Sequence, residues 1–219
     1  MKTLILTGAS SRIAEEFGKT VDPARVKILR AGRFEGAELK VDFAKPDETR
    51  EFARTLAARK PDYLFLNHGT LPGKRLGDYT DAEVSESLSV NLVSYLAVFE
   101  ALTTIPNLRT VATSSISGTA GSFDTLYAAA KAGLDVAIRS FAKQIPATSR
   151  LNGVAPGIVS DTRMTAARKD LDVLERKRAA TPTGKFTEAR EIAGLVKYLL
   201  FESENMNGEI VHVNGGLVT

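Results

Sequence analysis

The chain has 219 residues, of which 43% are hydrophobic and 25% charged, and its net charge is +3. This balance is typical of a globular protein, and the length suits a single α/β domain over residues 1–219. The absence of cysteine excludes disulfides and thiolate ligands, and His68 and His212 are far apart, so we expect no metal site. Acidic residues are interspersed with the basic ones, which favours a mixed solvated surface over a nucleic-acid partner.

No apolar stretch approaches the ~18 residues of a membrane span. The first apolar run, residues 3–6, is too short for a signal peptide. We therefore expect a cytoplasmic protein with no membrane partner.

Short apolar runs alternate with longer helical patterns along the chain. We expect strands at residues 3–6, 26–29, 39–41, 63–66, 110–113, 151–154 and 210–213. We expect helices near residues 13–19, 47–59, 81–102, 126–143, 166–179 and 188–200, and Thr80 with Glu83 resembles a capping box. This alternation predicts a doubly wound Rossmann fold, with a mostly parallel seven-stranded sheet and helices on both faces. Ligands of such folds bind at the carboxyl ends of the strands.

The first strand is followed by a turn of small residues, Thr7-Gly8-Ala9-Ser10-Ser11, and then by a helix. Backbone N–H groups at such a turn and at the following helix N-terminus can bind a pyrophosphate. Only Gly8 is a glycine, so this stretch alone is equally compatible with a plain strand–helix turn.

Two arginines, Arg30 and Arg33, follow the second strand, where an acidic residue would indicate NAD. Arginine binds phosphate through several donors, so this pair favours NADP over NAD, the alternative being two surface arginines in a loop. Asp42, beside Phe43, has two interpretations: it accepts from an adenine amino group or it caps a turn. Asn67 is expected to bridge neighbouring strands, and His68 to be structural.

Ser115, Tyr127 and Lys131 follow the fifth strand. Tyrosine and lysine four residues apart share one helix face. A phenol with a pKa of ~10 is a poor base at neutral pH, and a nearby cation lowers that pKa. A serine hydroxyl can hydrogen-bond the same substrate oxygen, so the three residues form a plausible proton-transfer set for an alcohol/carbonyl pair. Each of them alone has an ordinary surface interpretation.

With these residues in place, the chain resembles the short-chain dehydrogenase/reductase family over nearly its whole length. The matching stretches are residues 7–11 (TGASS), 67–69 (NHG), 90–92 (VNL), 114–118 (SSISG), 127–131 (YAAAK), 152–157 (NGVAPG), 207–208 (NG) and 213–216 (VNGG). The resemblance implies a Rossmann fold and NAD(P)-dependent interconversion of a small-molecule carbonyl and alcohol.

The family pattern also implies residue roles. Tyr127 would be the general acid/base, Lys131 would lower its pKa and hold the nicotinamide ribose, Ser115 would orient the carbonyl, and Asn91 would support a proton relay through water. Pro156, Gly157 and Ile158 would lie along the nicotinamide. The full cofactor-binding set is Gly8, Ser10, Ser11, Arg12, Ile13, Arg30, Arg33, Asp42, Phe43, Asn67, Gly69, Tyr127, Lys131, Pro156, Gly157, Ile158 and Thr162.

The chain departs from the family pattern at several positions. Arg12 and Ala14 replace two glycines of the nucleotide turn. Arg12 would either crowd the pyrophosphate or contact a cofactor phosphate, and we expect the contact. The spacing to Tyr127 selects Ser114, whereas the Ser-x-x-Gly pattern selects Ser115, which we prefer. Asp161 stands where the family often has a carboxamide-binding threonine, so Thr162 is the candidate.

We expect the substrate beneath residues 160–182 and a homodimer or homotetramer, with contacts through residues 209–213 and the long helices after strands four and five. The main alternative is a non-catalytic NADP-binding regulatory or scaffold protein of the same fold, motivated by the altered glycine turn. A sugar-nucleotide epimerase or dehydratase is a second enzyme alternative, and a nucleic-acid binder is the least favoured.

Overall fold

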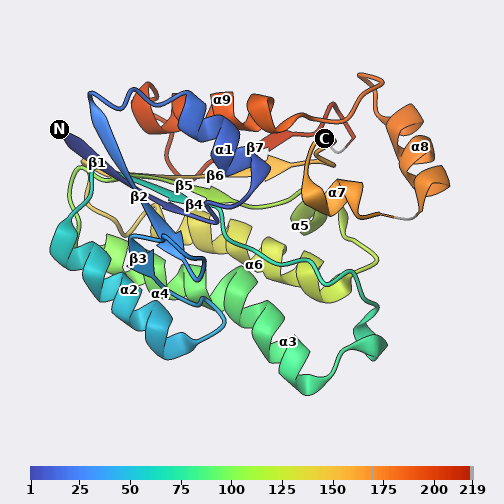
Figure 1. Ribbon diagram of the computed structural model, residues 1–219, viewed down its shortest axis with the longest axis horizontal. Helices are drawn as coiled ribbons and strands as arrows, with labels where there is room; N and C mark the ends of the chain where they lie inside the picture. Colours follow the sequence, from blue (N-terminus) through green and yellow to red (C-terminus); the bar gives the residue numbers. More distant parts are fainter. Residues whose placement is uncertain (169, 218–219) are drawn as a thin grey trace.

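The computed structural model describes residues 1–168 and 170–217. Its centre is a seven-stranded sheet in which every strand pairs in parallel with its neighbour (Figure 1). The strands are β1 Lys2–Thr7, β2 Val26–Gly32, β3 Leu39–Lys40, β4 Tyr63–Leu66, β5 Arg109–Thr113, β6 Arg150–Pro156 and β7 Ile210–Val213. Their order is β3-β2-β1-β4-β5-β6-β7, so the chain switches direction between β1 and β4. The predicted Rossmann fold is thus confirmed, and its parallel sheet has a crevice at this switch point.

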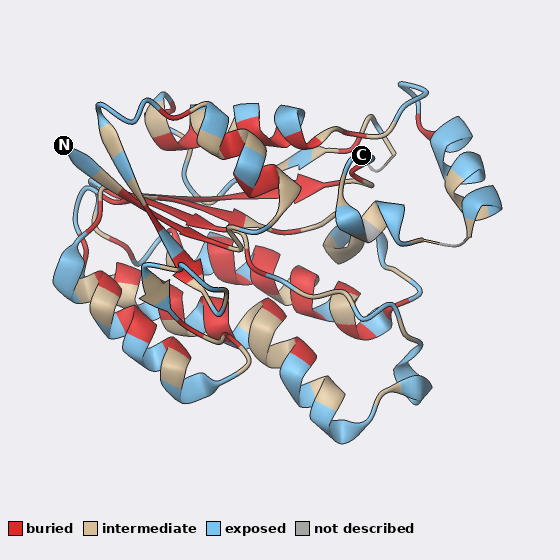
Figure 2. Ribbon diagram, viewed as in Figure 1, coloured by how far each residue is buried: buried red, intermediate tan, exposed pale blue. Residues whose placement is uncertain are grey.

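Helices cover both faces of the sheet (Figure 1). One layer holds α1 Arg12–Lys19 and α9 Ala189–Phe201, and the other holds α2 Pro46–Arg59, α4 Ser94–Leu102 and α6 Thr125–Phe141. Each layer buries its own core, with Phe17 and Phe65 on the α1 side and Tyr95 and Phe99 on the α4 side. Figure 2 shows the strands and the inner helix faces as buried. Strands that are covered on both faces explain the nearly continuous apolar runs in the sequence.

The helix expected over residues 81–102 is interrupted. It consists of α3 Asp81–Leu88, a π-helical turn at Ser89–Val93, and α4. The predicted capping box is confirmed, because Thr80 and Glu83 each accept from the other's backbone N–H. A π turn adds a residue to the helical turn and occurs frequently at functional sites.

The helix expected at residues 166–179 is replaced by two shorter ones, α7 Arg163–Ala166 and α8 Leu171–Ala180. α7 begins early because the Thr162 side chain accepts from the Thr165 N–H and caps it. Residue 169, inside the expected helix, lies outside the described residues. The remaining short helices are α5 Ser117–Ala120 and a 3₁₀ turn at Leu76–Asp78. None of the described helices is long and apolar enough to cross a membrane.

The connection from β2 to β3 consists only of residues 33–38, and it contains no helix. Parallel neighbours ordinarily need a crossover of about a dozen residues or more. Gly36, with φ of 79°, lies within this short connection. Val26 and Ile28 of β2 therefore remain only partly buried on the α1 side of the sheet.

Substitution of Gly8, at the end of β1, tests whether the close approach of this residue to Asn67 requires glycine. Its φ is 61°, and a Cβ there would lie 2.2 Å from the Asn67 carbonyl oxygen. We expect Gly8→Ala to destabilise the fold by more than the roughly 1–2 kcal/mol that left-handed backbone alone costs. The matched control is Gly194→Ala in α9, where nothing lies within 4 Å of the added methyl. This change should stabilise by about 0.5–1 kcal/mol. Urea unfolding measures the free energy of unfolding of both variants, and equal changes in this free energy would contradict the prediction.

Candidate active site

The turn after β1 is held by a network around Asn67, at the end of β4. The Asn67 amide donates to the Ser11 hydroxyl at 2.7 Å and accepts from the Thr113 hydroxyl at 2.9 Å. Ser11 in turn caps α1 by accepting from the Ala14 N–H at 3.1 Å. The carboxyl ends of β1, β4 and β5 are therefore tied together, as the sequence predicts for Asn67.

His68 has a structural role in the same network. Its Nδ1 lies 2.8 Å from the Thr7 hydroxyl and its Nε2 lies 3.0 Å from the Ser94 hydroxyl. Its ring stacks between Phe43, at 3.7 Å, and Tyr95, at 4.2 Å. Burial and the nearby Lys131 charge hold the pKa of His68 well below its usual value, so the ring is neutral at pH 7.

A groove of ≈ 340 Å³ opens at the switch point between β1 and β4. It brings together eight of the predicted cofactor residues, namely Gly8, Ser10, Ser11, Arg33, Asp42, Phe43, Asn67 and Gly69. The first N–H groups of α1 border this groove and lack intrahelical acceptors by helix geometry. A dinucleotide fits here, since Gly8 leaves no side chain between the turn and Asn67, and free N–H groups can receive a phosphate.

Not every predicted cofactor residue lines this groove. Arg30 is turned toward Glu38, with its Nε 3.3 Å from the carboxylate. Arg33 does line the groove, and its guanidinium lies 3.8 Å from Asp42. The Asp42 carboxylate accepts from the Ala44 N–H at 3.1 Å, which is the turn-capping alternative for this residue.

The Arg12 side chain contacts carboxylates of this chain, whereas we expected from the sequence that it would be available to a cofactor phosphate. The guanidinium contacts three carboxylates: Glu15 at 2.8 Å, Glu16 at 2.7 Å and Asp161 at 3.4 Å. Asp161 also accepts from the Ala189 N–H, at the start of α9. The Arg12 side chain is thus held by acids of this chain, and a contact with a cofactor phosphate requires it to leave them.

The side chains of two further predicted cofactor residues make contacts within the chain. Ile13 packs its side chain into the core and can offer only its backbone N–H. The Thr162 hydroxyl donates to the Val159 carbonyl at 3.2 Å while it caps α7. A carboxamide contact by Thr162 would have to replace this internal bond.

Tyr127 and Lys131 lie on the first turns of α6, close to the end of β5. Asp124 caps this helix by accepting from the Tyr127 N–H at 3.0 Å. The Lys131 ammonium donates to the Thr113 carbonyl at 2.8 Å and lies 5.8 Å from the centre of the Tyr127 ring. The predicted pair therefore lies together, with Lys131 buried and Tyr127 partly buried.

Ser115, rather than Ser114, is directed toward the tyrosine. The Ser115 hydroxyl is close enough to the Tyr127 phenol to lower its pKa, whereas Ser114 is buried next to Asp135. Gly118 permits this arrangement, because a Cβ there would lie 2.9 Å from the Lys131 carbonyl carbon. The Ser-x-x-Gly pattern thus allows α5 to pack closely on α6 and supports the choice of Ser115.

The local electrostatics set the protonation states of this pair. Burial raises the pKa of Tyr127 to about 12, although the nearby Ser115 hydroxyl opposes the rise, so the lowered pKa expected from Lys131 is not found. Burial lowers the pKa of Lys131 to about 8, against an opposing effect of Asp135. At pH 7 the site therefore holds a neutral phenol beside a lysine that is mostly charged.

Asn91 lies in the π turn, fully buried, on the far side of Gly69 from Lys131. Its amide accepts from the Thr70 N–H at 3.0 Å and donates to the Thr70 carbonyl at 2.9 Å. A Cβ at Gly69 would lie 3.2 Å from the Asn91 carbonyl oxygen and 3.8 Å from the Lys131 ammonium. Glycine at this position thus keeps open the space between the two polar side chains.

Pro156, Gly157 and Ile158 lie at the carboxyl end of β6, outside the groove lining. The Pro156 carbonyl accepts from the Ile116 N–H at 3.1 Å, which places this segment beside the Ser115 loop. A Cβ at Gly157 would lie 3.0 Å from the Asn214 Cα, so the chain packs closely there. These residues therefore border the reactive end of the site, as expected.

Several residues at the site escape the sequence analysis, and three of them bear on the argument. Arg163 and Phe34 line the groove. Asp124 joins the loop after β4 to α6, because its carboxylate accepts from the Gly73 N–H and the Tyr79 hydroxyl. None belongs to a recognisable motif. The only available signals were the place of Arg163 just after β6 and the place of Asp124 at a helix start.

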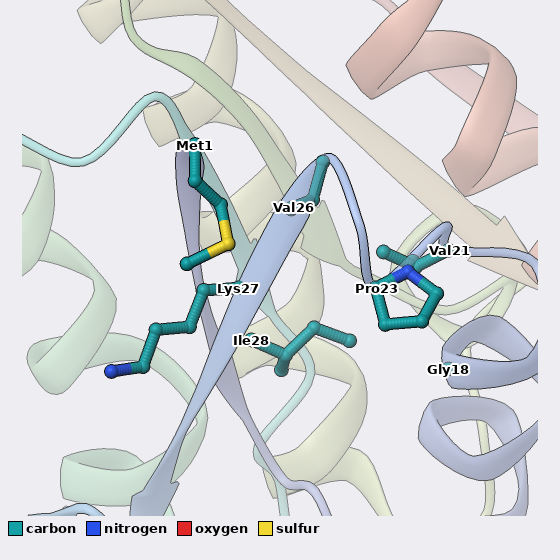
Figure 3. Close-up of a pocket in the computed structure, with 7 residues that line it drawn as sticks. All are labelled: Met1, Gly18, Val21, Pro23, Val26, Lys27 and Ile28. Atoms are coloured by element: carbon teal, nitrogen blue, oxygen red, sulfur yellow. The ribbon is translucent and has the colours of Figure 1, made fainter.

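A second hollow, of ≈ 540 Å³, lies at the opposite end of the strands. It is lined mainly by apolar residues beside the start of β2, including Val21, Val26 and Ile28 (Figure 3). It lies where the helix-free crossover leaves β2 partly uncovered. Tyr127 and Lys131 lie near the carboxyl ends of the strands, where ligands of parallel sheets bind, so this hollow is at the wrong end of the sheet to be part of the same site.

The lowered pKa of Lys131 predicts how the stability of the protein depends on pH. Because the folded protein holds this proton more weakly than the unfolded chain, whose pKa is 10.5, the unfolded chain binds more protons between about pH 8 and 10.5. The buried charge thus costs stability below pH 8, and this cost disappears as the pH rises. Relative to Lys131→Met, the wild type should gain roughly 3 kcal/mol across this window. Urea unfolding at pH 7.5 and 10.5 measures it, and a constant difference would refute the assignment.

The comparisons with known proteins agree with this geometry. Residues 11–218 match the sequence model of a family described as enoyl-(acyl carrier protein) reductase, one of the short-chain dehydrogenase/reductase group. The chain is 29% identical to the 3-oxoacyl-[acyl-carrier-protein] reductase FabG of Escherichia coli, over 99% of this chain and 97% of that protein. It is 27% identical to the uncharacterized oxidoreductase YmfI of Bacillus subtilis, over 98% of both.

Solved structures share the fold. A short chain dehydrogenase from Burkholderia cenocepacia in complex with NADP has a TM-score of 0.85 at 23% identity, over 99% of this chain and 97% of that one. The RhlG/NADP complex from Pseudomonas aeruginosa has a TM-score of 0.84 at 22% identity, over 99% and 96%. With the family match spanning almost the whole sequence, the chain belongs to the short-chain dehydrogenase/reductase family of oxidoreductases.

Proposed function

We propose that this protein is an NADP(H)-dependent reductase that interconverts a carbonyl and an alcohol, with Tyr127 as the general acid/base. The observation that carries the proposal is the grouping of the partly buried Ser115 and Tyr127 with the buried Lys131 beside the dinucleotide groove. A protein that only binds the cofactor needs no such group, so the regulatory or scaffold alternative leaves this arrangement unexplained.

The protonation states support the direction of proton transfer. Tyr127, with a pKa raised to about 12, is a neutral phenol at pH 7 and can donate its proton to a carbonyl oxygen. Ser115 donates a second hydrogen bond to the same oxygen. The Lys131 ammonium, fixed by the Thr113 carbonyl, stabilises the negative charge that then develops on the phenol oxygen. Asn91 borders the open space at Gly69, through which a water can return the proton.

The groove supports the cofactor assignment. When bound, NADPH supplies the hydride that reduces the carbonyl carbon. The α1 N-terminus receives the pyrophosphate, and Phe34 and Phe43 border the part of the groove that suits an adenine. Arg33, which lines the groove, supplies donors for a 2′-phosphate, and Arg30 adds donors when it leaves Glu38. Two of the related structures are complexes with NADP, which points to the same cofactor.

The substrate class follows from the polar groups at the reactive end. The Ser115 and Tyr127 hydroxyls are close to each other, and two neighbouring hydroxyl donors suit a carbonyl oxygen, which favours reduction of a carbonyl over reduction of a carbon–carbon double bond. Because the FabG relatives are named 3-oxoacyl-[acyl-carrier-protein] reductases, 3-oxoacyl thioesters are the first substrates to assay.

A homodimer or homotetramer remains part of the proposal. Val136 of α6 is 61% exposed, and Leu96 of α4 is exposed on the neighbouring helix. Apolar side chains exposed on these two helices support the expected contact surface.

The catalytic role of Tyr127 is tested by Tyr127→Phe. We expect turnover of a 3-oxoacyl thioester to fall by roughly 100- to 10,000-fold, because the proton donor is lost, while NADPH affinity changes little. The control is Tyr198→Phe, which removes the hydroxyl of an exposed tyrosine in α9. NADPH oxidation, followed by absorbance, measures both variants. Turnover that survives Tyr127→Phe intact would rule out the mechanism.

Cofactor preference is tested by the double variant Arg30→Ala/Arg33→Ala. It should weaken NADPH binding at least about tenfold, because charge-assisted bonds to the 2′-phosphate are lost, and should leave NADH binding nearly unchanged. Arg50→Ala/Arg54→Ala on α2 removes the same charge away from the groove and serves as the control. Calorimetric titration gives the four affinities. Equal losses for both cofactors would remove the basis for choosing NADP.

A further inference from the structure

Two contacts bridge the nucleotide turn and the segment that follows β6, which are about 150 residues apart in the sequence. The Arg163 guanidinium donates to the Ser10 carbonyl at 2.7 Å. Arg12 contacts Asp161 at 3.4 Å. The same turn borders the groove in which we place the dinucleotide. Any cofactor in that groove therefore passes close to one or both arginines.

The two arginines differ in how far their charge is already neutralised. Arg12 lies outside the groove lining and is surrounded by Glu15, Glu16 and Asp161. Arg163 lines the groove together with Gly8, Ser10 and Ser11, and among residues 1–168 and 170–217 none of the ion pairs involves it. Within the part of the chain that the structure describes, its guanidinium makes one hydrogen bond, to a backbone carbonyl, which leaves most of its five N–H donors available.

Asp161 explains how Arg163 is held in place. One of its oxygens accepts from the Ala189 N–H at 2.9 Å and the other pairs with Arg12. The segment that carries Arg163 is therefore anchored to α9 on one side and to α1 on the other. An arginine fixed in advance loses less side-chain entropy when it binds a phosphate.

We propose that Arg163 is the arginine that binds the cofactor pyrophosphate, and that Arg12 acts indirectly by holding Asp161 and the segment that carries Arg163. This assignment rests on the proposed NADP(H)-dependent function and deepens it. It gives the Arg12 substitution in the glycine turn a positioning role, in place of the direct phosphate contact expected from the sequence.

The test is calorimetric titration of Arg163→Met, Arg12→Met and the control Arg190→Met, which alters an exposed arginine of α9 outside the groove. The ligands are NADPH, NADH and adenosine 2′-monophosphate. Arg163→Met should weaken both dinucleotides by about 10- to 100-fold, because both carry the pyrophosphate. Binding of adenosine 2′-monophosphate, which lacks a pyrophosphate, should stay unchanged. Arg12→Met should weaken the dinucleotides by no more than about fivefold, since exposed ion pairs contribute little.

The outcomes separate this inference from the proposed function. If the unaltered protein binds neither dinucleotide, the proposed function fails and this inference fails with it. If the unaltered protein binds them and Arg163→Met binds equally well, or if Arg12→Met costs more than Arg163→Met, only this inference is overturned. A loss for NADPH that is absent for NADH would place Arg163 at the 2′-phosphate and would also overturn it.

Discussion

The close approach of Gly8 to Asn67 is the constraint on which the rest of the site depends. The two residues end β1 and β4, the strands between which the chain reverses its order, and a crevice must form there. The left-handed backbone of Gly8 lets the chain turn sharply into α1, whose N-terminus then faces the crevice. The Asn67 side chain fixes that turn through Ser11 and reaches Thr113 at the end of β5. The nucleotide end and the reactive end are thereby joined by one side chain.

Thr113 connects Asn67 to Lys131. Its hydroxyl donates to Asn67, and its carbonyl accepts from the Lys131 ammonium. The buried lysine carries a stability cost, because burial disfavours its charged form. In the proposed mechanism that cost has a use, since a cation beside Tyr127 would stabilise the phenolate that proton donation produces. The network thus places the groove proposed for the cofactor and the proposed proton donor at one edge of the sheet.

The sequence predicts the sheet well, for an identifiable reason: most strands are short apolar runs because both faces of the sheet are largely covered. Tyr127 and Lys131 are four residues apart on one helix, so their proximity also follows from the sequence, whereas the choice of Ser115 over Ser114 rests on the Ser-x-x-Gly pattern and not on its spacing to Tyr127. The π turn around Asn91 escaped prediction because one extra residue per turn leaves the apolar pattern of residues 81–102 almost unchanged. The position of Arg163 also escaped, since its contact with Ser10 joins distant parts of the chain. The partners of Arg12 depend on the side-chain arrangement, which spacing alone does not determine.

The most direct test of the account is a crystal structure of the protein with NADPH. We predict that the pyrophosphate lies at the N-terminus of α1 and that the nicotinamide lies beside Pro156 and Gly157, with its reactive carbon facing the Tyr127 hydroxyl. The adenine should lie near Phe34 and Phe43, in the groove of ≈ 340 Å³. A dinucleotide bound elsewhere, such as in the hollow beside the start of β2, or a nicotinamide remote from Tyr127, would contradict the account.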